Sequence, residues 1–380
     1  MSETANTDTL SRPPPQQSGQ SALFDLLARS WQLEAGISSL CFDKAGKVAG
    51  FALENGRLAL MALEDPDSPV SRMRVEADSG RSTIRPREKP VAQPILTPDL
   101  AEGAAMLAPS GTLGLIAAGR DGRLHRVTPR GQVIAMTDRS DPIFALASDS
   151  TGKLAIARED RTDIHAEEGI KRLSAVPTPG PANALAFAPT EEALAIMLEE
   201  SLLIAQPGGG CERQPLGGKG PLVFSADGAW LAGSNGKDGF WMLRRKDAAV
   251  TQLASFRATP SAITFSTNAI FASGAFRAAG WSLDGPPAAD GQAGALRTGR
   301  SGLVLIDQVA AHPGRNLIAI GTADGAVALA RPGQSEEMPL RQADGHAITA
   351  LVWSADGIHL AIGTASGAAA LLTLPPQLFK

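Results

Sequence analysis

The sequence predicts an all-β protein, a β-propeller built from four-stranded antiparallel blades. Three observations lead to this prediction. A phrase of three short apolar strands recurs along the 380 residues, tight turns containing glycine separate the strands, and the copies follow one another at intervals of about 40 residues. The 40 glycines and 27 prolines exceed the ordinary share and show no collagen-like period, so we expect them in turns between many short strands.

The clearest copy of the repeat runs from Ile348 to Leu374. It reads ITALVWS, a turn at Ala355-Asp356-Gly357, HLAIGTA, a turn at Ser366-Gly367, and AAALLTL. Apolar runs of this length are too short for helices and suit strands that are buried on both faces. Further copies begin at Leu40, Met106, Phe144, Leu185, Leu222, Ile263 and Val309.

The second turn of the repeat is Asn-Gly or Asp-Gly in several copies. These dipeptides favour the two-residue type I′ hairpin, in which both central residues need a positive φ. We therefore predict tight type I′ turns, with structural roles for both residues, at Asn55-Gly56, Asp121-Gly122, Asp238-Gly239 and Asp324-Gly325.

The pattern resembles divergent repeats of the WD40 family, and the likeness covers roughly Trp31 to Leu374. The last copy has that family's Gly-His pair, Gly345-His346, directly before its first strand, and we predict a turn or capping role for this histidine. No copy ends in Trp-Asp, and the family's His–Ser/Thr–Trp hydrogen-bond network is incomplete in every copy. The resemblance implies a rigid ring that holds other proteins.

The copies also predict how many blades there are and how the ring closes. Eight three-strand units are present, and the last has no fourth strand of its own, whereas ARSWQL (Ala28 to Leu33) precedes the first unit and is strand-like. We predict eight blades, closed by this N-terminal strand completing the last blade, which removes a reactive sheet edge. Seven blades, the usual number in the family, is the alternative if the weak copy at Leu185 or Ile263 is not a blade.

The chain divides into a tail and one domain. Residues 1–20 are polar and proline-rich and predict a disordered tail, followed by a single propeller over 21–380 with a short helical turn from Leu23 to Leu27. A Pro- and Arg-rich insertion at about 66–99 lengthens the first repeat. We expect its SRMRVEA stretch to form the outer strand of the first blade and the remainder to be an exposed loop.

The cations of this insertion are the candidate partner-binding residues. Insertions on a rigid scaffold often carry function, and Arg suits the recognition of carboxylates and phosphates. A solvated linker between two blades is the alternative interpretation. The candidates are Arg72, Arg74, Arg81, Arg85, Arg87 and Lys89.

Composition limits the possible functions. A net charge of -4 leaves no large basic field for nucleic acid or an anionic membrane. Cys41 and Cys211 are far apart, no signal peptide is evident and no apolar run could span a bilayer, so we expect a cytoplasmic location. The histidines lack metal-ligand spacing, and nucleophile and nucleotide-binding motifs are missing. We predict no catalytic residue, no cofactor and no metal site.

We therefore expect a non-catalytic scaffold, monomeric on its own, that binds unidentified protein partners. The alternative is a propeller-type hydrolase of the lactonase or phytase kind, with its site at the channel mouth. Such chemistry needs carboxylate, His or Arg side chains, or a bound Ca²⁺, gathered at that mouth. Inner strands such as ITALVW and AITFST place few charges there.

Overall fold

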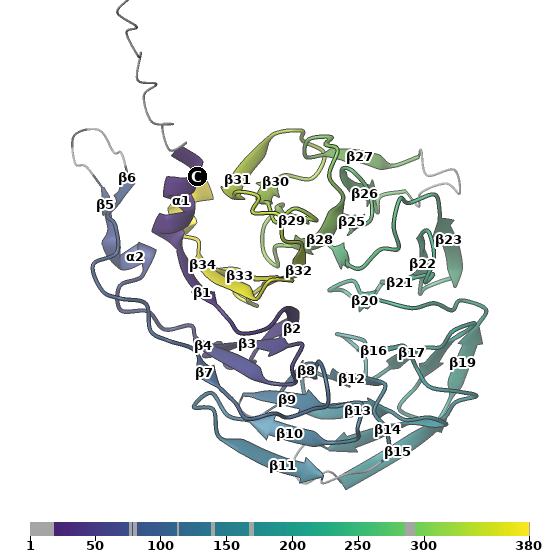
Figure 1. The fold of residues 1–380 in the computed structure, drawn as a ribbon. Coiled ribbons are helices and arrows are strands. Elements are labelled where there is room, and N and C mark those ends of the chain that lie inside the picture. Colours follow the sequence, from purple (N-terminus) through teal and green to yellow (C-terminus); the bar gives the residue numbers. More distant parts are fainter. Residues whose placement is uncertain are drawn as a thin grey trace, which may run out of the picture.

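The protein is a ring of eight four-stranded antiparallel sheets arranged around one axis (Figure 1). The computed structural model describes residues 19–75, 78, 82–111, 114–137, 141–166, 171–285 and 293–379. The predicted eight-bladed propeller is confirmed, including blades at both weak copies, so the seven-bladed alternative is wrong. No helix among these residues is long and apolar enough to cross a membrane.

Each blade uses its strands in order from the axis to the rim, and the first strands of neighbouring blades contact one another around the axis. The first four blades are β2 (Ile37–Phe42), β3 (Val48–Leu53), β4 (Leu58–Ala62) and β7 (Ile95–Leu96); β8 (Met106–Pro109), β9 (Leu115–Ala118), β10 (Leu124–Val127) and β11 (Val133–Thr137); β12 (Ala145–Ser148), β13 (Lys153–Ala157), β14 (Arg161–Ala166) and β15 (Lys171–Pro177); and β16 (Ala184–Phe187), β17 (Leu194–Met197), β18 (Leu202–Ala205) and β19 (Cys211–Gln214).

The remaining blades continue the same plan, except that the last one contains a strand from the other end of the chain. Blades 5 to 8 are β20 (Leu222–Phe224), β21 (Trp230–Ser234), β22 (Phe240–Arg244) and β23 (Ala249–Leu253); β24 (Ile263–Phe265), β25 (Ala269–Ala272), β26 (Ala278–Ser282) and β27 (Ala295–Thr298); β28 (Ile306–Ala311), β29 (Ile318–Thr322), β30 (Val327–Ala330) and β31 (Glu337–Arg341); and β32 (Ile348–Trp353), β33 (His359–Thr364), β34 (Ala368–Thr373) and β1 (Ala28–Gln32).

The strand β1 closes the ring. It pairs antiparallel with β34, with Ala28 opposite Leu372 and Gln32 opposite Ala368. The predicted closure by an N-terminal strand is thereby confirmed, and the last blade gains its fourth strand. The helix α1 (Gly19–Leu27) precedes β1 and contacts β31, and the short 3-10 helix η1 (Pro376–Phe379) follows β34.

The apolar core lies between neighbouring blades. The second strands are buried on both faces because they are runs of small and aliphatic residues without polar alternation; β3, VAGFAL, is buried at every position. One such layer joins Leu40 and Phe51 of blade 1 to Ala361 and Leu371 of blade 8. The fold therefore depends on each blade packing against both neighbours.

The second turns of the repeats are not the predicted type I′ hairpins. Gly325 has a φ of 93°, but the only non-glycine residues with positive φ in the described part of the chain are Ala248 and Ser255. Gly325 N–H donates to Thr322 O at 3.1 Å and Thr322 N–H to Ala326 O at 3.0 Å, the pattern of a type I turn closed by a left-handed glycine. Left-handed glycines also occupy this position at Gly56, Gly122 and Gly367.

The Asp or Asn before the glycine has a different role from the predicted one. Asp324 Oδ1 accepts hydrogen bonds from Thr322 Oγ1 (2.5 Å) and Ala326 N (3.4 Å), so it ties the turn together through its side chain. The turn at Asp238-Gly239 is built differently again. There Gly236 is the left-handed residue, with a φ of 75°, and Asn235 Oδ1 accepts from the backbone N–H of Gly239 at 3.1 Å.

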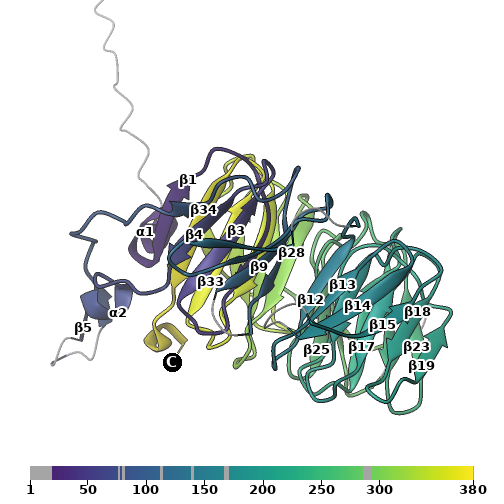
Figure 2. The same ribbon diagram turned by 90° about the horizontal axis from the view of Figure 1, so that it is seen from below.

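The insertion of the first blade folds outside the ring, beside α1 (Figures 1 and 2). The SRMRVEA stretch is not the outer strand; its described residues form the end of α2 (Pro69–Arg72) and β5 (Met73–Val75), which pairs with β6 (Ser82–Ile84). The reason is local. Ser68 accepts from Ser71 N (3.2 Å) and Pro69 follows it, a helix start that turns the chain away from the blade. The two residues of β7 complete the blade instead.

Candidate functional site

The two faces of the ring carry different loops. Because neighbouring strands are antiparallel, the second turns of all blades and the connections between blades lie on one face, which we call the upper face. Backbone hydrogen bonds join these loops: Gly218 N–H donates to Leu198 O (2.9 Å) and Gly345 N–H to Asp324 O (2.8 Å). The upper face is therefore a continuous surface with a fixed backbone.

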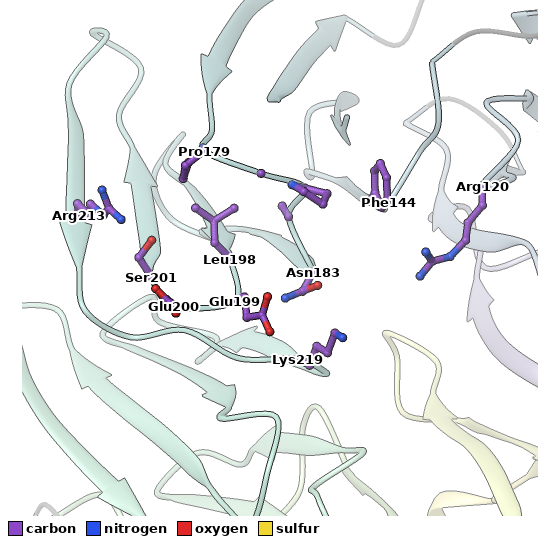
Figure 3. Close-up of a pocket in the computed structure, with 13 residues that line it drawn as sticks. Arg120, Phe144, Pro179, Asn183, Leu198, Glu199, Glu200, Ser201, Arg213 and Lys219 are labelled. Atoms are coloured by element: carbon purple, nitrogen blue, oxygen red, sulfur yellow. The ribbon is translucent and has the colours of Figure 1, made fainter. Parts of the chain in front are cut away.

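A pocket of about 550 Å³ opens on the upper face between blades 3 and 4 (Figure 3). Arg120 and Phe144 lie on one side, Glu199, Glu200 and Arg213 lie on the other, and Asn183 and Lys219 lie between them. The walls thus come from several blades: the second turns of blades 2 and 4, the connections into blades 3, 4 and 5, and the outer strand β19. The rest of the lining is Pro179, Gly180, Pro181, Ala182, Leu198 and Ser201.

Glu199 and Glu200 form the second turn of blade 4, where several other blades have Asp-Gly or Asn-Gly. Leu198 N–H donates to Ser201 O at 2.8 Å and closes this turn. Gly217 in the next connection packs directly beneath it, since a Cβ at that position would lie 2.1 Å from Glu199 O. Both glutamates are exposed at the rim of the pocket on a rigid turn.

The charged groups of the pocket form no ion pairs within the part of the chain that the structure describes. The guanidinium of Arg120 lies over the ring of Phe144, 5.9 Å from its centre. Lys219 and Arg213 are exposed. Among the described residues, none of these three cations and neither glutamate has an ion-pair partner, so the pocket offers charges of both signs to an incoming molecule.

On the upper face, the second turns of blades 3 and 4 differ in charge from the loops of blades 5 and 6. The second turns of blades 3 and 4 carry Glu159 and Asp160, then Glu199 and Glu200, and the arginines beside the first pair are bonded to aspartates. The loops of blades 5 and 6, residues 215–221, 235–239, 254–262, 273–277 and 299–305, contain one acid, Asp238. Their cations are Lys219, Lys237, Arg257, Arg277 and Arg300. The pocket lies where the acidic and basic parts meet.

Two of the predicted partner-binding arginines hold the insertion in place. Arg72 is 3% exposed and donates to the backbone oxygens of Leu26 (2.6 Å) and Asp67 (3.0 Å). Arg87 makes a two-pronged hydrogen bond to the carboxylate of Asp65, with distances of 3.1 and 2.5 Å. The same carboxylate lies 3.8 Å from Arg29 of the closing strand. These guanidinium groups are used inside the molecule.

The other predicted cations point to solvent and are not brought together. Arg74 and Lys89 are exposed. The side chain of Arg85 is 47% exposed and lies 3.8 Å from Glu88. Arg81 lies outside the described residues. The predicted turn residues Gly345 and His346 lie in a bend, with Gly345 at a φ of 86° and the backbone N–H of the exposed His346 donating to Asp344 Oδ1 at 3.1 Å.

A second pocket, of about 670 Å³, opens on the opposite face across blades 5, 6 and 7. Its ionisable groups serve turns. Ser225 Oγ and Ala229 N–H donate to Asp227, and the first of these bonds lowers the pKa of that carboxyl. Asp284 accepts from Ser282 Oγ (3.3 Å), and His312 is bonded at both ring nitrogens. Among the described residues, no three His, Cys, Asp or Glu side chains gather closely enough to bind a metal.

The sequence reasoning missed the pocket of the upper face. Its residues are distant in sequence, and only the ring brings Arg120 near Asn183 and Lys219. One signal was present in the sequence, because Glu199-Glu200 replaces the Asp-Gly turn that other copies have.

The comparisons with known proteins agree with this architecture. The model of the family described as "Anaphase-promoting complex subunit 4 WD40 domain" matches residues 310–375, in blades 7 and 8. The propeller of Dos1 is similar in structure, with a TM-score of 0.63 at 14% identity, covering 94% of this chain and 96% of that one. The C-terminal WD40 domain of Sif2 has a TM-score of 0.59 at 13% identity, covering 92% and 99%. No curated protein matches this sequence.

The computationally designed Ika8 protein is also similar in structure, with a TM-score of 0.60 at 15% identity, and the match covers 90% of this chain and 98% of that one. The fold and these matches define a β-propeller. More narrowly, the chain is an eight-bladed β-propeller, and its residues 310–375 match a WD40-domain model.

Proposed function

We propose that this protein is a non-catalytic scaffold that binds other proteins through its upper face, chiefly at the pocket between blades 3 and 4. The observation that supports the proposal is the set of five exposed ionisable side chains around that pocket, namely Arg120, Glu199, Glu200, Arg213 and Lys219. Unpaired charges on a rigid backbone favour a partner of complementary charge and suppress the wrong ones.

The pocket also has the mixed character of a protein-binding surface. Phe144, Pro179, Pro181 and Leu198 supply apolar and aromatic contact area, and the ionisable groups surround them. Protein interfaces commonly combine such an apolar centre with a polar rim. An extended peptide with an apolar side chain between charged ones would satisfy both parts.

Photo-crosslinking in the native host tests this proposal. A photoreactive amino acid is placed at Arg120 or Arg213, at the pocket, and as a control at Lys246, in the turn after β22 away from the upper face. The expected result is a specific crosslinked protein from the pocket positions only, lost in the double variant Glu199→Lys, Glu200→Lys. Crosslinks from Lys246 alone, or crosslinks unchanged in that double variant, would contradict it.

The exposed cations of the insertion, Arg74, Arg85 and Lys89, stay a predicted second binding surface. Since Arg72 and Arg87 hold the insertion together, the variant that tests this surface is Arg74→Glu with Arg85→Glu.

We further propose a cytoplasmic location, because Cys41 and Cys211 are both free thiols. A propeller-type hydrolase with its site at the channel mouth stays the alternative; in the second pocket, on the opposite face, the ionisable groups are bonded within turns.

A further inference from the structure

The upper face over blades 5 to 7 is a second, separate surface. Phe256 N–H donates to Asp238 O (2.9 Å), Arg257 N–H to Gly274 O (3.0 Å) and Gly302 N–H to Phe276 O (3.0 Å). These bonds join the second turn of blade 5, the connection into blade 6, the second turn of blade 6 and the connection into blade 7. Side chains that are distant in sequence are therefore presented on one fixed surface.

Exposed apolar side chains lie at the centre of this surface. Leu303 is 96% exposed, and Phe276 and Val304 are 38% and 37% exposed. The loop that carries Leu303 is held on both sides, by the bond from Gly302 N–H and by Ile306 N–H donating to Ala275 O at 2.9 Å. A fully exposed leucine on a held loop, next to two further apolar side chains, forms an apolar surface of the kind found at interaction sites.

Unpaired cations surround these apolar residues. Lys237, Arg257, Arg277 and Arg300 come from the same four loops, and none of them has an ion-pair partner in the described part of the chain. The Nε of Arg277 is buried without a hydrogen-bond partner. Glu337 lies near Arg300 but accepts from its backbone N–H, at 2.6 Å, through Oε1. The excess of positive charge is local, because the whole chain carries -4.

We propose that this surface, Phe276, Leu303 and Val304 with Lys237, Arg257, Arg277 and Arg300, docks an acidic segment of a partner protein that carries an apolar side chain. The apolar side chain packs on Leu303 and Phe276, and carboxylates of the segment pair with the arginines, whose planar guanidinium groups suit them. The inference rests on the proposed scaffold function and names the chemistry of one partner.

An acidic protein segment fits better than nucleic acid. Stacking on bases would need several exposed aromatic rings, and Phe276 is the one exposed aromatic side chain among the described residues of these loops.

Fluorescence anisotropy with the full-length protein tests the proposal. The probe is a fluorescein-labelled peptide of about twelve residues, made of Glu and Asp with two central leucines. Controls are the same peptide with serine for leucine, the same peptide with lysine for the acids, and a single-stranded oligonucleotide of equal length. We expect the acidic leucine peptide to bind most tightly, with an affinity that falls as salt is added.

Two sets of variants locate the binding. Arg257→Glu with Arg300→Glu, and separately Leu303→Ser, should each weaken the acidic leucine peptide by about tenfold or more. The matched control is Lys246→Glu with Arg297→Glu, which makes the same charge change on blades 5 and 6 outside this surface and should leave binding within about twofold. Thermal unfolding confirms that every variant is folded.

The proposal would be overturned if the acidic leucine peptide did not bind, if the serine peptide bound equally well, or if the oligonucleotide bound more tightly. It would also be overturned if the control pair lost as much affinity for the peptide as Arg257→Glu with Arg300→Glu. The scaffold proposal is tested independently by the crosslinks at Arg120 and Arg213. If those crosslinks persist while the peptide fails to bind, only the inference about the basic surface is wrong.

Discussion

His312 in blade 7 is hydrogen-bonded to Gly357 in blade 8, with 3.1 Å between the imidazole Nε2 and the carbonyl oxygen. Gly314 N–H donates to the other ring nitrogen, Nδ1, at 3.0 Å, so Nε2 carries the proton and donates. The ring also packs against Trp353 at 4.7 Å between centres, and Trp353 Nε1 donates to Ala310 O at 3.1 Å. One neutral imidazole thus links the first turns of two adjacent blades.

This link predicts a stability effect. Changing His312 to Ala removes a buried hydrogen bond and leaves a cavity beside Trp353, so the free energy of unfolding should fall by about 2 to 3 kcal/mol. Urea denaturation measures it. The control is His346→Ala, because that side chain is exposed, and it should change little. Equal effects of the two changes would show that His312 makes no special contribution.

The same histidine predicts how stability depends on pH. Burial lowers the pKa of His312 below the usual 6.5, and the hydrogen bond to Gly357 offsets only part of the effect. The unfolded chain therefore takes up a proton at a higher pH than the folded protein does, so stability falls as the pH drops below about 6.5. Urea denaturation at about pH 7.5 and about pH 5.5 should show a smaller loss in His312→Gln than in the unchanged protein. A loss of the same size in both would contradict this role of His312.

A buried ion network predicts that the insertion stabilises the ring closure. Asp65 pairs with Arg87 of the insertion and Arg29 of β1, and its carboxylate is 6% exposed. Burial alone would raise the pKa of Asp65, but the hydrogen bond from Arg87 and the charge of Arg29 bring it below its usual range. Asp65→Asn leaves the buried Arg29 without its counter-charge, and we expect a loss of about 3 kcal/mol in thermal or urea unfolding.

Asp160→Asn is the matched control for that variant. The Asp160 side chain is 75% exposed and pairs with Arg161 at 2.9 Å on the surface, where ion pairs contribute little. Limited proteolysis gives a second measurement, because cleavage between 66 and 99 should be faster in Asp65→Asn. If cleavage there were unchanged and the two variants were equally stable, the network would not hold the insertion.

The repeat made most of the fold predictable, because the information is local. Apolar runs such as VAGFAL specify strands that are buried on both faces. A single blade cannot cover both of its apolar faces, so each blade must stack on its neighbours. The closing strand was predictable because the last unit lacks a fourth strand and ARSWQL has no other partner. The type of the second turns could not be predicted. Asp324 does not adopt the positive φ of a type I′ turn, and it stabilises the turn by accepting a side-chain hydrogen bond from Thr322.

The candidate sites depend on contacts between distant segments, which the sequence could not supply. Arg72 and Arg87 look like free cations in a proline-rich loop, yet Arg72 donates to the backbone oxygen of Leu26 and Arg87 to the carboxylate of Asp65, both of which precede that loop. Likewise, Leu303 follows an unremarkable Ser-Gly pair, and its exposure follows from bonds to Phe276 in the neighbouring blade. Charge along the chain does not show which charges are paired.

The two cysteines should differ sharply in reactivity. Burial, with a further contribution from the charge of Asp43, raises the pKa of the Cys41 thiol to about 12, so almost no thiolate is present near neutral pH. Cys211 is exposed at the start of β19, although partial burial raises its pKa as well.

A thiol-reactive dye at about pH 8 should therefore label Cys211 first in the folded protein and both cysteines once the protein is unfolded. Cys211→Ser should remove the fast reaction and Cys41→Ser should retain it. Fast labelling of Cys41 in the folded protein would contradict this difference in reactivity.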